Sequence, residues 1–229
     1  FLSPLQFDVV IGSLLGDARL ECRSIGERSE KTARLRIHHS DKQKEYVFWK
    51  YEVLKNLVLK GPQRIMVWYD SKRDHKHYSQ YFHTGSFEEF GMLHQEFYRK
   101  ETKILPNDIF QLMNPRMLAV WFMDDGSNTQ KSFTLSTHCF SLEEQQRIVQ
   151  FFQQNYGMHV TIVKDRAKYK VSIGRSEYER FTRIIEPFII PSMIYKIDNP
   201  RNDSASLYRS RMENEVLHNT SVLNQTEVE

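Results

Sequence analysis

The chain has 229 residues, of which 40% are hydrophobic and 27% charged, and its formal net charge is +3. This composition is typical of a soluble globular protein. The two cysteines, Cys22 and Cys139, are far apart without metal-ligand spacing, so we expect reduced thiols and an intracellular protein. No apolar run is long enough to span a membrane and no signal-peptide pattern is present, so we expect no membrane partner.

The first half of the chain begins with an apolar helix that ends in an acidic residue, residues 10–18 (VIGSLLGDA), followed by a polar turn at 21–30. Hydrophobic periodicity and turn residues then predict a strand, a helix, two strands and a helix. The predicted ranges, in that order, are 34–38, about 42–59, 64–70, 77–84 and about 86–99.

The same order recurs after a second apolar helix, residues 118–126 (LAVWFMDDG). A strand at 132–137 precedes a helix that opens with a capping box of Ser141 and Glu144 and stops at Gly157. Two strands and a helix follow, at 158–164, 169–174 and about 176–185. The recurrence predicts an internal duplication with a pseudo-two-fold axis. We expect an N-terminal half at 1–103, a linker at 104–116, a C-terminal half at 117–198 and a mostly disordered polar tail at 199–229.

The two apolar helices each deliver a carboxylate at their last turn, Asp17 and Asp125. If the helices pair across the pseudo-dyad, these carboxylates lie side by side and repel each other unless they are protonated or bridged by cations. Hard divalent metals take oxygen ligands, so Mg²⁺ suits such a site. The alternative is that the small residues only permit close helix packing and that the two acids cap loops.

Both helices resemble the signature helix of LAGLIDADG homing endonucleases, in the single-chain form that carries two copies. Residues 118–126 match this pattern well, and the first copy departs from it only in Ala18, where glycine is usual. The resemblance covers residues 5 to 198. It implies an α+β fold of two αββαββα units, with the signature helices paired at their interface and two antiparallel DNA-binding sheets forming a saddle.

The resemblance also implies roles for individual residues. Asp17 and Asp125 would bind two or three divalent cations, Mg²⁺ with Mn²⁺ or Ca²⁺ as substitutes, helped by the carbonyls of Gly16 and Asp124. The Asp124 side chain has Gly16 as its counterpart, so we expect it to be a structural or solvated carboxylate instead. The family also has a basic residue near each metal centre, and Lys103 and Lys196 occupy the matching places. They would stabilise phosphorane charge or orient the attacking water.

The outward positions of the predicted strands are rich in cationic and hydrogen-bonding groups, as β-ribbons that read the major groove require. A solvated sheet face would also be polar. His138 is also a candidate for positioning water at the second metal. The candidates for DNA contacts are Arg34, Arg36, His38, Arg64, Trp68, His77, Ser79, Tyr81, His83, Thr134, Ser136, His138, Thr161, Lys168, Lys170 and Ser172.

These residues favour a monomeric, site-specific homing endonuclease. It would use divalent metals to make a staggered double-strand break in a long, asymmetric duplex target. The same scaffold could instead serve as a maturase with intron RNA as its partner, or as a non-cleaving DNA-binding regulator. The retained acid and lysine pairs favour the nuclease. Family resemblance alone suggests an organellar origin.

Overall fold

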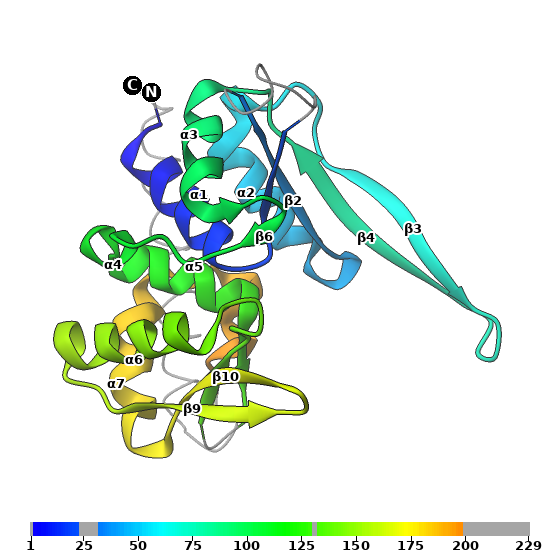
Figure 1. Ribbon diagram of the computed structural model, residues 1–229. Helices are drawn as coiled ribbons and strands as arrows, with labels where there is room; N and C mark the ends of the chain where they lie inside the picture. The colour runs from blue at the N-terminus through cyan, green and yellow to red at the C-terminus, as the bar shows by residue number, and fades with distance from the viewer. Residues whose placement is uncertain (1, 23–31, 130–131, 199–229) are drawn as a thin grey trace, which may run out of the picture. The chain divides into compact units, whose positions relative to one another are not determined.

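The computed structural model describes residues 2–22, 32–129 and 132–198 (Figure 1). Residues 1–196 form one compact unit, and residues 197–229 are assigned to a second. The predicted tail at 199–229 and most of the predicted polar turn lie outside the described residues. No helix in the described part of the chain is long and apolar enough to cross a membrane.

The first half has the predicted order of elements, with one strand that the sequence did not reveal. Residues 19–21, of which only Glu21 was expected in a turn, form a strand of their own. This strand is the first in a four-stranded antiparallel sheet with the order β1-β2-β4-β3. The elements are α1 (Pro4–Leu15), β1 (Arg19–Glu21), β2 (Arg34–Ser40), α2 (Lys44–Leu54), β3 (Gln63–Asp70), β4 (His75–His83) and α3 (Glu88–Phe97).

The second half repeats this arrangement element by element. Its sheet has the order β7-β8-β10-β9, which is the same first, second, fourth and third strand order. The elements are α5 (Pro115–Asp125), β7 (Gly126–Asn128), β8 (Phe133–Leu135), α6 (Leu142–Tyr156), β9 (Val160–Asp165), β10 (Lys168–Ile173) and α7 (Tyr178–Ile185). The predicted α+β fold of two αββαββα units is therefore confirmed.

The segment between the halves contains a two-stranded ribbon, β5 (Tyr98–Arg99) with β6 (Thr102–Lys103), and a short helix, α4 (Ile109–Leu112). α5 begins at Pro115, inside the range predicted as linker. It can begin there because Asn114 accepts a hydrogen bond from the backbone N–H of Met117, and proline is favoured in the first helical turn.

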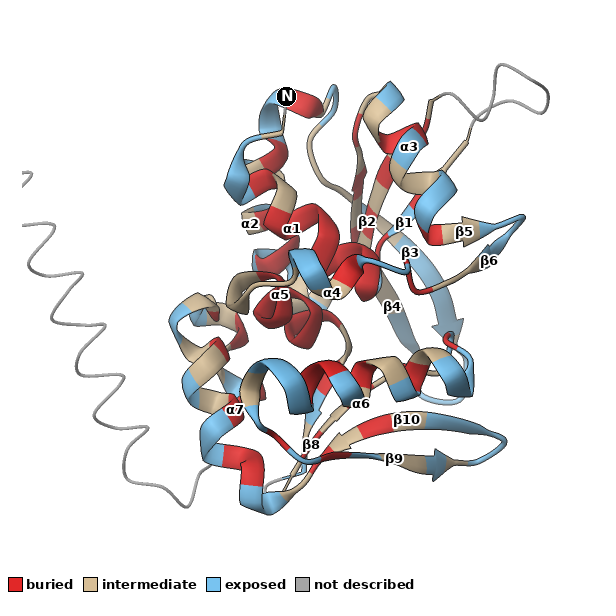
Figure 2. Ribbon diagram, turned by 60° about the vertical axis from the view of Figure 1, so that its left-hand side comes forward, coloured by how far each residue is buried: buried red, intermediate tan, exposed pale blue. Residues whose placement is uncertain are grey.

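α1 and α5 pack against each other and are buried along most of their length (Figure 2). The two helices approach closely at Gly12, where a Cβ would lie 2.6 Å from the carbonyl oxygen of Met117 and 2.7 Å from the Cβ of Val120. Glycine at this position therefore lets the two helix backbones come together. α1 ends at Leu15, two residues before Asp17, while α5 does end at its acid, Asp125.

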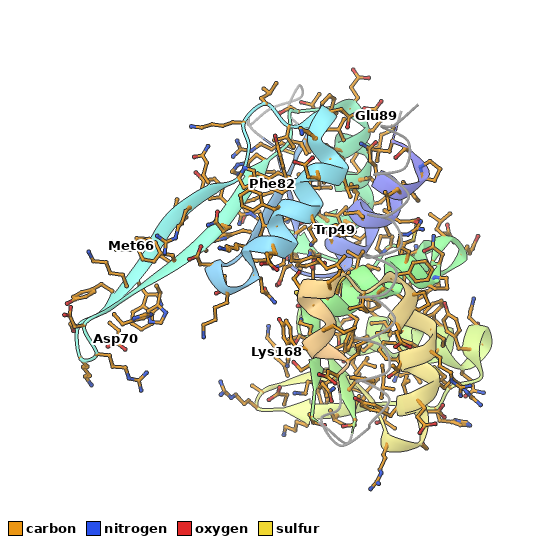
Figure 3. All side chains as sticks on the ribbon, turned by 180° about the vertical axis from the view of Figure 1, so that it is seen from behind. Trp49, Met66, Asp70, Phe82, Glu89 and Lys168 are labelled. Atoms are coloured by element: carbon orange, nitrogen blue, oxygen red, sulfur yellow. The ribbon has the colours of Figure 1, made fainter. Side chains whose placement is uncertain are left out.

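β3 and β4 form a ribbon that continues past the end of β2, because β2 pairs with β4 only from Ser79 to His83 (Figures 1 and 3). The register of β3 on β4 shifts between Met66 and Trp68. Such an irregularity changes which face of the ribbon the following side chains occupy.

Substituting Gly12 by alanine should separate the helices, because the added methyl group has no space. We expect Gly12→Ala to lower the free energy of unfolding by about 1–2 kcal/mol, since overpacking outweighs the gain of roughly 1 kcal/mol in helix propensity. Chemical denaturation measures this change.

The matched control is Gly174→Ala, because a Cβ at Gly174 meets nothing within 4 Å. A Gly12→Ala protein as stable as the wild type would show that the α1–α5 packing is looser than described.

Candidate metal and nucleic-acid site

The two predicted acids lie at adjoining ends of the paired helices. Asp17 follows α1 in a turn, with its side chain 47% exposed, and Asp125 is the last residue of α5. Burial and the negative charges of Asp17 and Asp124 raise the pKa of Asp125 to about 8. The negative charge of Asp17 is therefore one of the causes, after burial, that favour the protonated form of Asp125.

Asp17 has the opposite tendency. Burial raises its pKa, but His39, whose Nδ1 lies 3.5 Å from Oδ2 of Asp17, and the ammonium groups of Lys50 and Lys196 lower it by more. One carboxylate of the pair thus favours the charged form and the other the neutral form, as in other closely spaced acid pairs.

The two predicted lysines occupy equivalent places in the two halves. Lys103 donates hydrogen bonds to the carbonyls of Gly16 and Ala18, at 2.7 and 2.9 Å. Lys196 donates to the carbonyls of Met123 and Asp124, at 2.5 and 3.0 Å. Each ammonium group is therefore bound at the carboxyl end of a signature helix, where cations are favoured. Burial lowers the pKa of both lysines.

The Asp124 side chain is fully buried, so the solvated alternative for it is wrong. Its Oδ1 accepts hydrogen bonds from Nζ of Lys50 and from the hydroxyl of Tyr46, both at 2.7 Å. Lys50 and Asp124 are each 0% exposed in their side chains. A buried charge is tolerated only when it is paired and hydrogen-bonded, and here both conditions are met.

This buried pair also contacts the loop that carries Asp17. Oδ2 of Asp124 accepts a hydrogen bond from the backbone N–H of Asp17 at 3.3 Å, across the helix interface. A Cβ on Gly16 would lie 2.4 Å from the Cβ of Asp124. The first signature helix must therefore have glycine where the second has aspartate, because the interface has room for only one such side chain.

Most of the predicted contact residues of the first half share one sheet face. Arg36 lies opposite His83, and His38 lies opposite Tyr81; directly opposed residues point to the same side. Nε2 of His38 is 2.7 Å from the hydroxyl of Ser79. On the ribbon, Trp68 lies opposite His77, and their rings stack with centroids 4.2 Å apart.

Arg64 is an exception among these candidates, because it does not share the sheet face of Trp68. It lies opposite Gln80, on the other face of the sheet, because the irregularity between Met66 and Trp68 reverses the alternation. Its guanidinium group pairs with Asp41 at 3.1 Å and lies over the ring of Tyr78.

In the second half, Thr134, Thr161 and Ser172 are aligned across three strands and share a face. Lys168 and Lys170 follow on the same face of β10, and Ser136 and His138 lie beyond the end of β8. Asp165 pairs with Lys170 at 2.9 Å and with His138 at 3.2 Å. His138 is thus bound to a carboxylate of the sheet.

The acid site and the first sheet are connected by an open pocket. Asp17 lies in its wall together with His39, Arg36 and His38, and the ribbon residues Trp68 and His77 line it further along. A long ligand on this sheet face could therefore extend to Asp17. Within residues 2–22, 32–129 and 132–198, no three His, Cys, Asp or Glu side chains form a metal-binding group.

The model of the LAGLIDADG DNA endonuclease family matches residues 7–181. The chain belongs to this family. The range includes both signature helices and both sheets, so the family match and the duplicated fold agree.

Relatives of two kinds are similar to this chain. The cytochrome b mRNA maturase bI2 of Debaryomyces hansenii is 30% identical over 87% of this chain and 77% of its own length. The DNA endonuclease I-ChuI of Chlamydomonas applanata is 27% identical over 86% of this chain and 96% of its own length. Among solved structures, the homing endonuclease I-WcaI bound to its DNA recognition sequence matches with a TM-score of 0.77 and 25% identity, covering 86% of this chain and 87% of that one.

Three residues around Asp17 and Asp124 were not found from the sequence: His39, Tyr46 and Lys50. A usable signal existed for Lys50, because Tyr46, Lys50 and Leu54 recur at a spacing of four on the buried face of α2. A lysine in such a row requires a buried acid elsewhere. Asp124, which has no acidic counterpart in the first signature helix, is the acid that fits this requirement.

The raised pKa of Asp125 makes stability depend on pH. In the folded chain this carboxyl keeps its proton up to about pH 8, whereas its ordinary pKa is 3.8. Between these two pH values the folded state therefore binds more protons than the unfolded state. Stability should therefore fall as pH rises through this window. In EDTA, Asp125→Asn should melt at a higher temperature than the wild type at pH 8, with a smaller difference at pH 5.

The buried pair of Lys50 and Asp124 should be sensitive to removal of one partner. We expect Lys50→Met to lower the free energy of unfolding by about 3–5 kcal/mol, because it leaves a buried carboxylate unpaired. The double variant with Asp124→Asn should recover part of this loss.

The control is Lys55→Met, which removes an exposed pair with Glu52 and should change stability by less than about 1 kcal/mol. Additive effects of Lys50→Met and Asp124→Asn would contradict the pairing.

Proposed function

We propose that this protein is a site-specific homing endonuclease that hydrolyses one phosphodiester in each strand of a long, asymmetric DNA duplex. The staggered double-strand break would be made at the end of the α1–α5 pair. The observation that carries the proposal is the adjacency of Asp17 and Asp125, each with a lysine at the end of its own helix. A protein that only binds DNA has no need of this arrangement.

The donor set fits two or three Mg²⁺ ions, with Mn²⁺ or Ca²⁺ as substitutes. Mg²⁺ is usually held by one or two carboxylates and completes its shell with water and substrate phosphates, so two acids suffice. The repulsion that raises the pKa of Asp125 would be offset by cations. When bound, the ions would supply Lewis-acid stabilisation of the attacking and leaving oxygens.

The chain's own residues have separate tasks in this proposal. Asp17 and Asp125 hold the cations and fix where each scissile phosphate lies. The carbonyls of Gly16 and Asp124 already accept a lysine hydrogen bond, so each would contribute only its second lone pair. The ammonium groups of Lys103 and Lys196 would stabilise the charge that develops on the phosphoryl oxygens or orient the attacking water.

The two sheet faces would contact the major groove. Arginine on the first face suits guanine, and Thr134, Thr161 and Ser172 on the second can hydrogen-bond to either donors or acceptors. Because these faces differ in chemistry, the two half-sites should differ in sequence. The pocket from Asp17 to Trp68 and His77 supports continuous contact between the cleavage site and the readout surface.

The second candidate is a maturase that promotes splicing of an intron RNA. The similarity to the bI2 maturase favours it. The two functions are compatible on one scaffold, since cleavage would use the acid pair. A monomeric state and an organellar origin belong to the same proposal: both halves of the site are present in one chain, and related proteins are intron-encoded, as with one of Wickerhamomyces canadensis described as a probable intron-encoded endonuclease.

Asp17→Asn or Asp125→Asn should lower the rate of duplex cleavage by roughly 100-fold or more, because a transition-state stabiliser is lost. Duplex binding should stay unchanged or tighten. Asp17→Asn removes a negative charge near phosphates, whereas Asp125 without metal is already protonated below about pH 8, so Asp125→Asn leaves the charge nearly unchanged. Single-turnover cleavage in Mg²⁺ and fluorescence anisotropy in EDTA measure the two quantities.

A matched control for the lost charge is Glu88→Gln, at an exposed position in the first turn of α3. Cleavage by either aspartate variant at the wild-type rate would refute the acid site.

The nuclease and the maturase are separated by two assays on the wild-type chain. The proposal expects cutting of members of a randomised duplex library in Mg²⁺. If the chain cuts no duplex but accelerates splicing of an intron RNA, the proposed nuclease function is wrong and the maturase function takes its place.

A further inference from the structure

The carboxylate of Glu21 on β1 is surrounded by basic side chains. Oε1 accepts hydrogen bonds from Nε and Nη2 of Arg19, at 2.8 and 2.6 Å, and Oε2 accepts from Nε and Nη2 of Arg34, at 3.0 and 2.7 Å. Nη1 of Arg36 and Nε2 of His83 each lie 3.6 Å from one of its oxygens. We call Arg19, Arg34 and Arg36 the arginine cluster.

Strand register places this arrangement on the sheet face assigned to DNA above. Glu21 lies opposite Arg34, Arg19 lies opposite Arg36, and Arg36 lies opposite His83 on the next strand. The Glu21 side chain is only 17% exposed, whereas that of Arg19 is 58% exposed. Arg34 and Arg36 are 22% and 26% exposed, so the guanidinium group of Arg19 is the one that an approaching ligand meets first.

Glu21 remains ionised under all ordinary conditions. Partial burial raises its pKa, but the hydrogen bonds and charges of Arg19 and Arg34 lower it to about 2. The carboxylate therefore continuously binds donors of two arginines that a phosphate oxygen could otherwise bind. An open pocket at this point is lined by Glu21, Arg34, Arg36, Tyr81 and His83.

These contacts have two consequences for a polyanionic ligand. Guanidinium groups fixed at one edge by a carboxylate can turn their remaining donors only in set directions, which suits a planar, bidentate contact with a base edge. The same carboxylate repels phosphates and reduces the sequence-independent part of the affinity, which arises from neutralising phosphates. Both effects increase the difference between right and wrong sites.

We propose that Glu21 is a specificity-determining residue: it fixes the arginine cluster for base contacts and withholds it from phosphates. This inference rests on the proposed function, because it requires sequence-selective duplex binding. It differs from a direct reading of a base by Glu21, for which loss of the carboxylate would weaken binding to the target and leave other duplexes unaffected.

The test compares Glu21→Gln with the wild type in EDTA, on a duplex selected by the wild type and on a scrambled duplex of equal length. Glu21→Gln should bind the scrambled duplex at least about 5-fold more tightly, with a salt dependence steeper by about 1–2 in log–log slope. Affinity for the selected duplex should change by less than about 3-fold, so the specificity ratio falls.

Asp41→Asn is the matched control. Asp41 also pairs with an arginine, Arg64, and with Gln80, but on the other face of the same sheet. Asp41→Asn should leave the ratio of affinities for the selected and scrambled duplexes unchanged. Melting temperatures of both variants check that the folded state is retained, and Glu21→Asp, which keeps the charge, should restore part of the wild-type ratio.

The outcomes separate the two proposals. If the wild type selects no duplex from the library, the proposed function fails. If it selects one and Glu21→Gln keeps the wild-type ratio, or loses affinity only for the selected duplex, the role assigned to Glu21 is wrong and the proposed function stands.

Discussion

The close packing of α1 against α5 is the constraint on which the rest of the structure depends. Gly12 allows the two backbones to approach, and this approach brings the carboxyl ends of both helices to one place. Because helix ends carry free carbonyls, lysines from outside the pair can bind there, and Lys103 and Lys196 do so in equivalent positions. The positions of the acid pair and of the lysine pair therefore both follow from the α1–α5 interface.

That interface is symmetric in outline and asymmetric in detail. Asp124 fills the space that Gly16 leaves, and its charge is compensated by Lys50 and Tyr46 from α2 of the other half. A second aspartate at the Gly16 position would collide with the first. The two halves therefore share a fold but differ in this part of the core, where the buried ion pair of Lys50 and Asp124 connects them beside the proposed cleavage site. Such a pair contributes more to defining one arrangement than to stability.

The sequence was sufficient to predict the duplication and both four-stranded sheets, apart from their short first strands. Periodicity, caps and the family resemblance carry this information directly. Three kinds of feature could not be obtained in this way. β1 and β7 are only three residues long and exist through pairing with β2 and β8. The face of Arg64 depends on a register shift, which alternation alone does not reveal. The partners of Asp124 and Glu21 come from other strands and helices, so only the folded chain identifies them.

The central claim is that Asp17 and Asp125 form one cation site at the end of the α1–α5 pair. The most direct measurement is anomalous X-ray scattering from crystals of the wild-type chain with a selected duplex and Mn²⁺. The account predicts Mn²⁺ peaks within bonding distance of both carboxylates, next to the scissile phosphates. Peaks confined to other places on the protein, with these two carboxylates unligated, would contradict it.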